Sequence, residues 1–147
     1  MIFRSVALTM PSVTFRVPFV KGKARPRFSR GHAYTPKATS DAQETIAAAY
    51  VKACGGDALK ASEGVPVAVA VLTTRNVKSG FRRREGDSHD DLQKPDADNI
   101  AKLVLDALNG VAYEDDSQVF ALYVLKLPRR RGNDPTTYVG IFWGDDE

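Results

Sequence analysis

The stretch KPDADNIAKLVLDALNGVAYEDDSQV, residues 94–119, indicates both a central element of the fold and its chemistry. Its middle repeats apolar residues three or four positions apart, which predicts an amphipathic helix over about residues 97–109. Gly110 then stands where a helix commonly ends. Acidic residues gather at both ends of this helix: Asp96 just before it and Asp98 in its first turn, and Glu114, Asp115 and Asp116 after it.

The rest of the chain predicts a further helix and six strands. The helix is expected over residues 41–54, with Ser40 as N-cap and Gln43 completing a capping box. The strands are expected over residues 12–20, 27–30, 32–35, 65–73, 119–127 and 136–143. Segment 65–73 is apolar throughout, which favours a central strand buried on both faces. Residues 129–134 are expected to turn a hairpin between the last two strands.

This order, β-β-β-α-β-α-β-β, predicts a single small α+β domain in which a mixed sheet carries two main helices. The domain is expected to span residues 1–147, with residues 1–9 as an extension ahead of an alternative start at Met10. Residues 75–94 show little periodicity and are predicted to form a charged, flexible loop, because loops of this length are usually functional or disordered.

Composition limits the classes of function. The single cysteine, Cys54, excludes an internal disulfide and a cysteine-rich zinc site. No apolar run is long enough to cross a bilayer, and the first residues are not typical of a signal peptide, so a cytoplasmic location is expected.

The charge is distributed unevenly. Residues 1–40 hold eight basic residues and no acidic one, a charge of +8, so the remaining residues sum to −5 in a chain of net charge +3. This asymmetry favours a polyanionic partner, although a solvated basic face is an equal alternative on charge alone.

The acids of residues 94–119 allow two interpretations. Acids at a helix N-terminus can bind free N–H groups and suit the macrodipole, which would account for Asp96 or Asp98. Carboxylates that converge instead need a cation between them, and hard oxygen ligands select Mg²⁺ or Mn²⁺. Asp116 reaches Asp96 only if the chain retraces the helix after Gly110, which the sequence leaves open. A calcium EF-hand is excluded, because Ala101 and Ala107 stand where that loop needs glycine and glutamate.

Residues 94–119 resemble the signature of the RusA family of Holliday-junction resolvases, in which D-x-D-N opens a helix, a lysine and D-A-L follow, and D-D precedes a strand. The basic segment 21–27, KGKARPR, and Tyr34-Thr35-Pro36 also resemble that family, and the likeness covers about residues 13–125. The resemblance implies a small homodimeric, Mg²⁺-dependent endonuclease, often encoded by phages and prophages. Such an enzyme would resolve four-way junction DNA by paired symmetric nicks in recombination and repair.

The resemblance also assigns roles to residues. It makes Asp96, Asp98 and Asp116 the metal-binding catalytic acids and Lys102 the catalytic lysine, with Asp115 as a neighbour without an assigned role. A role of Lys102 as a surface partner of Asp98 and Asp106, four residues away on either side, is compatible with this assignment. Loop 75–94 matches no motif of the family.

Basic residues around the acids are expected to hold DNA phosphates. They are Lys21, Lys23, Arg25, Arg27, Arg30, Arg82, Arg83 and Arg84. Phe28 and Tyr34 could stack on unpaired bases, but aromatic residues in short strands are more often core, and the core is expected here. His32 and His89 are interpreted as loop histidines and Trp143 as a packing residue.

Two other classes of function stay open. The protein could bind branched DNA without cutting it, its acids merely capping a helix. It could also hydrolyse free nucleotides, although such a pocket would not need eight basic residues in the first forty.

Overall fold

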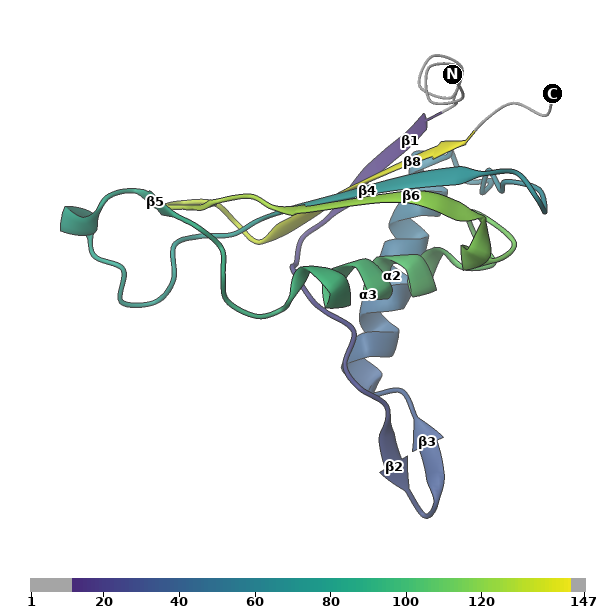
Figure 1. Cartoon of the computed structure of the whole chain (residues 1–147), viewed down its shortest axis with the longest axis horizontal. Coiled ribbons are helices and arrows are strands. Elements are labelled where there is room, and N and C mark those ends of the chain that lie inside the picture. The colour runs from purple at the N-terminus through teal and green to yellow at the C-terminus, as the bar shows by residue number, and fades with distance from the viewer. Residues whose placement is uncertain (1–11, 144–147) are drawn as a thin grey trace.

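The computed structural model describes residues 12–143, so the expected extension 1–9 lies outside the described part. One four-stranded sheet, in the order β1-β8-β4-β6, carries two helices on one face (Figure 1). The strands are β1 (Ser12–Val17), β4 (Val67–Thr74), β6 (Val119–Lys126) and β8 (Thr136–Trp143). The helices are α2 (Lys37–Ala53) and α3 (Ala97–Leu108). The predicted α+β class, with a mixed sheet and two main helices, is confirmed.

Smaller elements complete the described chain. Strands β2 (Arg27–Ser29) and β3 (His32–Tyr34) form a separate hairpin, and β5 (Ser88–His89) pairs with β7 (Arg129–Arg130). Two single 3-10 turns, η1 (Arg83–Glu85) and η2 (Asp116–Gln118), lie before α3 and after it. Loop 75–94 thus contains a turn and a short strand.

Helix α3 is the crossover between the two parallel strands of the sheet. Strands β4 and β6 are parallel neighbours, which requires a connection that returns across the sheet. The predicted hairpin between the last two strands is wrong. Strand β8 does not pair with β6 but lies between β1 and β4, antiparallel to both. Residues 127–135 carry the chain past the end of β4, and β8 gains ladder partners on both edges.

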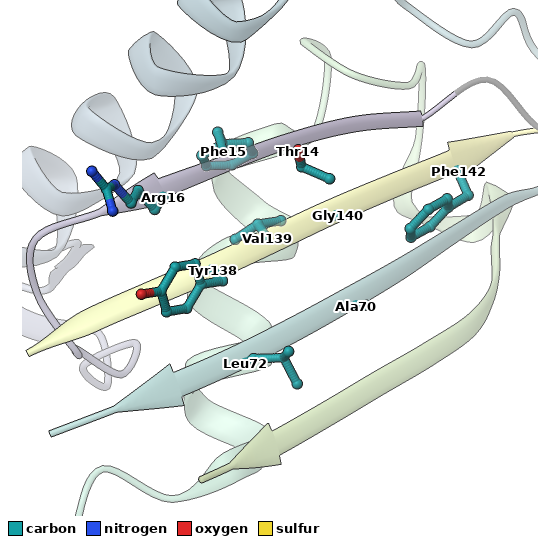
Figure 2. Close-up of a pocket in the computed structure, with 9 residues that line it drawn as sticks. All are labelled: Thr14, Phe15, Arg16, Ala70, Leu72, Tyr138, Val139, Gly140 and Phe142. Carbon is teal, nitrogen blue, oxygen red and sulfur yellow. The ribbon is translucent and has the colours of Figure 1, made fainter. Parts of the chain in front are cut away.

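The core lies between the helices and one face of the sheet. Helix α3 contributes Ile100, Leu103, Val104 and Leu108, and α2 contributes Ile46 and Tyr50. The prediction that β4 is buried on both faces is wrong, because its burial alternates along the strand. Both helices cover the same face, so the other face stays open. Figure 2 shows that open face, where Ala70, Leu72, Tyr138, Gly140 and Phe142 line a hollow of about 490 Å³.

Helix α2 begins four residues earlier than predicted. Pro36 is its N-cap, and the Pro36 carbonyl accepts hydrogen bonds from the amides of Thr39 and Ser40, at 3.0 and 3.1 Å. Ser40 therefore lies inside the first turn. Proline favours a helix start because its φ angle is already fixed near the helical value. The helix ends as predicted before Gly55, which has a φ of +88°.

The hairpin of β2 and β3 forms around Gly31 as predicted, but its aromatic residues are not core. Phe28 is 77% exposed and Tyr34 is 46% exposed. The hairpin projects beyond the N-terminal end of α2, away from the sheet (Figure 1). It has no second layer to cover it, which is why the expectation that these rings are buried fails.

The basic segment before the hairpin is packed against the start of α3. The Lys23 amide donates a hydrogen bond to the Asn99 carbonyl at 3.0 Å. Gly22 lies so close to α3 that a Cβ atom there would stand 2.9 Å from Pro95 Cβ and 3.0 Å from Asn99 Cβ. Trp143 packs against the core, as expected. Within residues 12–143, no helix combines the length and apolarity that a membrane span requires.

Replacing Gly22 by alanine tests this packing. Neither the Pro95 ring nor the backbone of α3 can yield cheaply, so Gly22→Ala is expected to lower the free energy of unfolding by about 1–3 kcal/mol. Chemical denaturation measures the change. Ala24→Ser, at an exposed position of the same segment, is the control and should change stability by less than about 0.5 kcal/mol. Equal stability of the two variants would show that Gly22 does not pack as described.

Candidate metal and nucleic-acid site

Asp96 and Asp98 stand exposed at the first turn of α3. Asp96 is the N-cap residue, yet its side chain makes no capping hydrogen bond; only its backbone carbonyl is used, by the Ile100 amide at 3.1 Å. Helix capping therefore does not account for the Asp96 carboxylate. Asp98 lies two residues further on, so two carboxylates open the helix with their oxygens available to a ligand.

The polar face of α3 is paired differently from the prediction. Lys102 Nζ lies 3.8 Å from Asp98 Oδ2, a loose pair between side chains that are 62% and 70% exposed. Asp106 is instead bridged by Lys23, whose Nζ lies 2.5 Å from Asp106 Oδ2. Exposed pairs of the first kind contribute little, about 0–1 kcal/mol. Lys102 is therefore held only weakly, whereas Lys23 fastens the basic segment to α3.

The second acidic group is fixed at the C-terminal end of α3. The buried Tyr113 hydroxyl donates a hydrogen bond to the Leu105 carbonyl at 2.7 Å. Burial raises the pKa of Tyr113, and the negative charges of Asp116, Asp106 and Asp115 raise it further. These three acids therefore share the environment around Tyr113.

Asp115 and Asp116 differ in their surroundings. Asp115 is the N-cap of η2 and accepts a hydrogen bond from Ser117 Oγ at 2.6 Å. This hydrogen bond is the main cause that lowers the pKa of Asp115. Asp116 is exposed, and within the described range its carboxylate takes part in no ion pair or side-chain hydrogen bond. Asp115 thus stabilises the turn, and Asp116 stays available to a ligand.

The two acidic groups do not meet in one chain. Helix α3 has 12 residues and is therefore about 18 Å long. In Figure 1 the chain does not retrace α3; η2 lies at the end of the helix opposite Asp96, and β6 runs back from there. Among residues 12–143, no three acidic, histidine or cysteine side chains are grouped so as to hold a metal ion. Asp96 and Asp98 nevertheless suit a hard cation, because Mg²⁺ typically takes one or two carboxylates and completes its shell with water and phosphate.

A buried ionic cluster, not foreseen from the sequence, lies behind the start of α3. The Asp91 side chain is fully buried, with Arg75 Nε 2.9 Å from Oδ2 and Arg75 Nη2 2.5 Å from Oδ1. Lys126 Nζ, at the end of β6, lies 3.7 Å from Asp91 Oδ1. Burial by itself raises the pKa of Asp91, but the hydrogen bond and charge of Arg75, with the charge of Lys126, outweigh burial and lower it.

This cluster also holds the backbone that leads into Asp96. Lys126 Nζ donates to the Gln93 carbonyl at 2.5 Å, and Arg75 Nη1 donates to the Lys94 carbonyl at 3.1 Å. Both acceptors lie within three residues of Asp96. In the sequence, Asp91 is next to Asp90 in a run of charged residues, and no local signal distinguishes the two. Only the tertiary structure, which brings Arg75 and Lys126 to Asp91, shows that Asp91 is the buried acid.

Loop 75–94 is further tied to the segment after β6. Arg129 Nε donates to the Asn76 carbonyl at 2.6 Å, and Arg131 Nη2 donates to the Gly86 carbonyl at 3.0 Å. His89 Nε2 accepts a hydrogen bond from the Lys78 amide at 2.9 Å. The interpretation of His32 and His89 as loop histidines is wrong, because they lie in the short strands β3 and β5.

The basic residues expected to bind DNA form two separate exposed groups. Arg25, Arg27 and Arg30 lie on and beside the β2–β3 hairpin, whereas Arg82, Arg83 and Arg84 lie at η1. The two groups project from different ends of the molecule in Figure 1, with α3 between them. Lys21 is also exposed, whereas Lys23 is partly buried. The apolar hollow of Figure 2 lies on the face of the sheet that the two helices do not cover, and no acidic residue lines it.

Exposed paired carboxylates on a basic α+β domain are features of a metal-dependent nuclease that acts on a polyanion. The chain belongs to the RusA family, because the family model described as Endodeoxyribonuclease RusA matches residues 18–142 of its 147 residues. Membership implies endonuclease activity and the resolution of Holliday junctions, and nucleases of this family generally depend on divalent metals. A search of curated proteins gives no match.

Replacing Asp91 by asparagine tests the buried cluster. Asp91→Asn leaves Arg75 and Lys126 buried without their anion, so the free energy of unfolding at neutral pH is expected to fall by about 3–5 kcal/mol. Because folding lowers the pKa of Asp91, its stabilisation is complete above the unfolded value of about 3.9 and is lost as the pH falls through the lower folded value. The difference between wild type and variant should therefore be constant from about pH 5 to 7 and shrink below about pH 4.

Denaturant titrations over this pH range measure the difference. Asp90→Asn is the control, since Asp90 is exposed and should show a change below about 0.5 kcal/mol at every pH. If the difference in the free energy of unfolding between wild type and Asp91→Asn does not change with pH, the stabilisation does not come from the Asp91 charge.

Proposed function

We propose that the protein is a Mg²⁺-dependent, structure-selective endodeoxyribonuclease that resolves four-way junctions by paired symmetric nicks, with Mn²⁺ able to substitute. It would act in recombination and repair in the cytoplasm, as a resolvase of the phage or prophage type. One observation carries the proposal: the Asp96 carboxylate at the N-cap of α3 makes no capping hydrogen bond and stands exposed two residues from Asp98. Family membership supplies the substrate class.

The chain's own residues have distinct tasks in this proposal. Asp96 and Asp98 would hold the metal, which would lower the pKa of a water and neutralise charge on the scissile phosphate. Lys102, 62% exposed and only loosely paired with Asp98, turns its ammonium to a phosphate oxygen and stabilises the developing charge. The arginines at the hairpin and at η1 bind flanking phosphates and offset the repulsion between the acids and DNA.

We further propose that the working enzyme is a homodimer in which Asp116 of one chain completes the acidic site of the other. Strand β6 is an edge strand of the sheet, and Phe120, Leu122, Tyr123 and Leu125 on it are 38–59% exposed. Long exposed apolar edges are sites of strand pairing. A two-fold symmetric dimer would pair β6 with its copy in antiparallel fashion.

The two ends of β6 correspond to the two halves of the site. Asp116 lies three residues before β6 begins, and Lys126 at its end contacts Gln93, three residues before Asp96. Antiparallel pairing of two copies therefore brings the Asp116 end of each chain to the Asp96 end of its partner. It also yields two sites related by a two-fold axis, which suits the two-fold symmetry of a four-way junction.

A second candidate function is binding of branched DNA without cleavage. It is favoured by the absence of a three-ligand metal group within residues 12–143 of a single chain. A pure binder needs the basic groups but not the Asp96 carboxylate, so the two functions differ in one measurable property.

Replacing Asp96 by asparagine separates them. Asp96→Asn should lower the rate of Mg²⁺-dependent junction cleavage by more than about 100-fold, beyond the usual effect of a residue that only supports a metal ligand. Junction affinity should stay the same or rise, because one negative charge near the phosphates is removed. Cleavage of a synthetic four-way junction, with Mg²⁺ and with chelator, and gel-shift binding measure the two properties.

Asp57→Asn is the matched control for this experiment, since Asp57 is exposed and lies outside the candidate site; it should cleave like wild type. If wild type shows no Mg²⁺-dependent cleavage of the junction, the protein is a binder. If it turns over free nucleotides and leaves the junction intact, it is a nucleotide hydrolase.

Mixing two inactive variants tests the shared site. In a mixed dimer of Asp98→Asn and Asp116→Asn, one site carries both substitutions and the other carries neither. Refolding the two together should therefore restore about a quarter of the wild-type sites, one site in each of the mixed dimers that make up about half of the total. The products should be single nicks. If each site lay within one chain, the mixture would be as inactive as either variant alone.

A further inference from the structure

The β2–β3 hairpin exposes an aromatic side chain that has no packing role in the chain. Every residue from 24 to 35 is exposed, and Phe28 at 77% is the most exposed aromatic residue of those described. A two-stranded hairpin with three residues in each strand gains little stability by itself in water. Phe28 therefore contributes little to the packing of the described residues, and its ring is accessible to a partner.

The hairpin turn presents an arginine at its tip. Arg30 and Gly31 form a two-residue loop with φ angles of +49° and +78°, the values of a type I′ turn. Asparagine or glycine takes the first of these positions at lower cost, and Arg30 is the only non-glycine residue with positive φ within residues 12–143. The unfavourable backbone position places a guanidinium at the most distant point of the hairpin.

The register keeps the Phe28 ring uncovered. Phe28 pairs with Ala33 across the two strands, and a methyl group cannot shield a phenyl ring from solvent. Arg27 pairs with Tyr34, and because side chains alternate along a strand, these two lie on the other face. One face of the hairpin thus offers a bare aromatic ring. Arg30 stands at the tip, and Arg27 lies on the opposite face.

The hairpin is attached close to the acidic site. Lys23 is fastened to α3 by its amide hydrogen bond to Asn99 and by its ion pair with Asp106. Phe28 follows five residues later, so it lies at most about 18 Å from Lys23 along an extended chain. This reach corresponds to about five base pairs of duplex DNA.

We propose that Phe28 stacks on a nucleobase that is unstacked at the branch point of the DNA, while Arg30 at the tip of the hairpin holds a flanking phosphate. The inference rests on the proposed function and adds a recognition element to it. A polyanion is the partner that the charge selects, because residues 12–40 contain seven basic residues and no acidic one. An uninterrupted duplex has no free base face, whereas a branch point exposes bases on which an aromatic ring can stack or between which it can wedge.

Binding measured without cleavage tests this inference. Full-length wild type, Phe28→Ala and Phe28→Trp are titrated, in chelator, with a four-way junction that carries 2-aminopurine next to the branch point and with a linear duplex of the same sequence. Phe28→Ala should bind the junction about 5- to 150-fold more weakly, the loss equivalent to one base–aromatic stack. It should also lose the 2-aminopurine fluorescence change, and Phe28→Trp should restore both.

Affinity for the linear duplex should change less than about 2-fold in Phe28→Ala, because the arginines remain. Tyr138→Ala, at a 41% exposed ring on the open face of the sheet, is the matched control and should keep the fluorescence change. Unchanged junction affinity in Phe28→Ala, or an equal loss on junction and duplex, would overturn the stacking role. The proposed nuclease activity fails separately, if wild type does not cleave with Mg²⁺.

Discussion

The length and position of α3 are the constraint on which the rest of this structure depends. The helix connects two parallel strands, β4 and β6, so it must run the length of the sheet before the chain can return. Its 12 residues separate the acids at its two ends by about 18 Å. A single chain cannot close that distance without dismantling the core beneath the sheet, where Ile100, Leu103 and Leu108 are almost fully buried. A site that used Asp96, Asp98 and Asp116 together would therefore depend on the homodimer proposed above.

The structure treats its acidic residues in two opposite ways. The Asp91 side chain is buried and forms ion pairs with Arg75 and Lys126. These two cations also bind the backbone just before α3, so the Asp91 charge stabilises that segment. Asp96 and Asp98 remain in solvent, and among residues 12–143 the only ion pair at either carboxylate is that of Asp98 with Lys102 Nζ, at 3.8 Å. A buried anion with two fixed cations is rigid, whereas exposed carboxylates keep their oxygens for a ligand. The buried cluster hydrogen-bonds the Gln93 and Lys94 carbonyls and so fixes the backbone that leads to Asp96. Support of this kind would preorganise a site at the exposed carboxylates.

The elements that the sequence predicted well are those whose signals are local. The spacing of Ile100, Leu103, Val104 and Leu108 and the glycine at 110 were sufficient for α3, which ends at Leu108, within one residue of the expected end. The signals that predicted the hairpin around Gly31 and the end of α2 before Gly55 were equally local. The start of α2 was missed because Ser40 offered a familiar cap, whereas Pro36 with its fixed φ angle begins the helix.

The errors concern neighbours in space. Strand β8 was expected beside β6 because the two follow one another in the chain, yet it lies between β1 and β4. Phe28 was expected in the core because most aromatic residues are, but no layer of the fold covers the hairpin. The sequence alone determined the two helices, the six longer strands and the uneven distribution of charge, because these depend on residues a few positions apart. The two-residue strands β5 and β7 were not predicted. Only the tertiary structure decided which acid is buried, which ring is exposed and that Asp116 stands at the far end of α3, because burial and distance arise from the packing of segments that lie far apart along the chain.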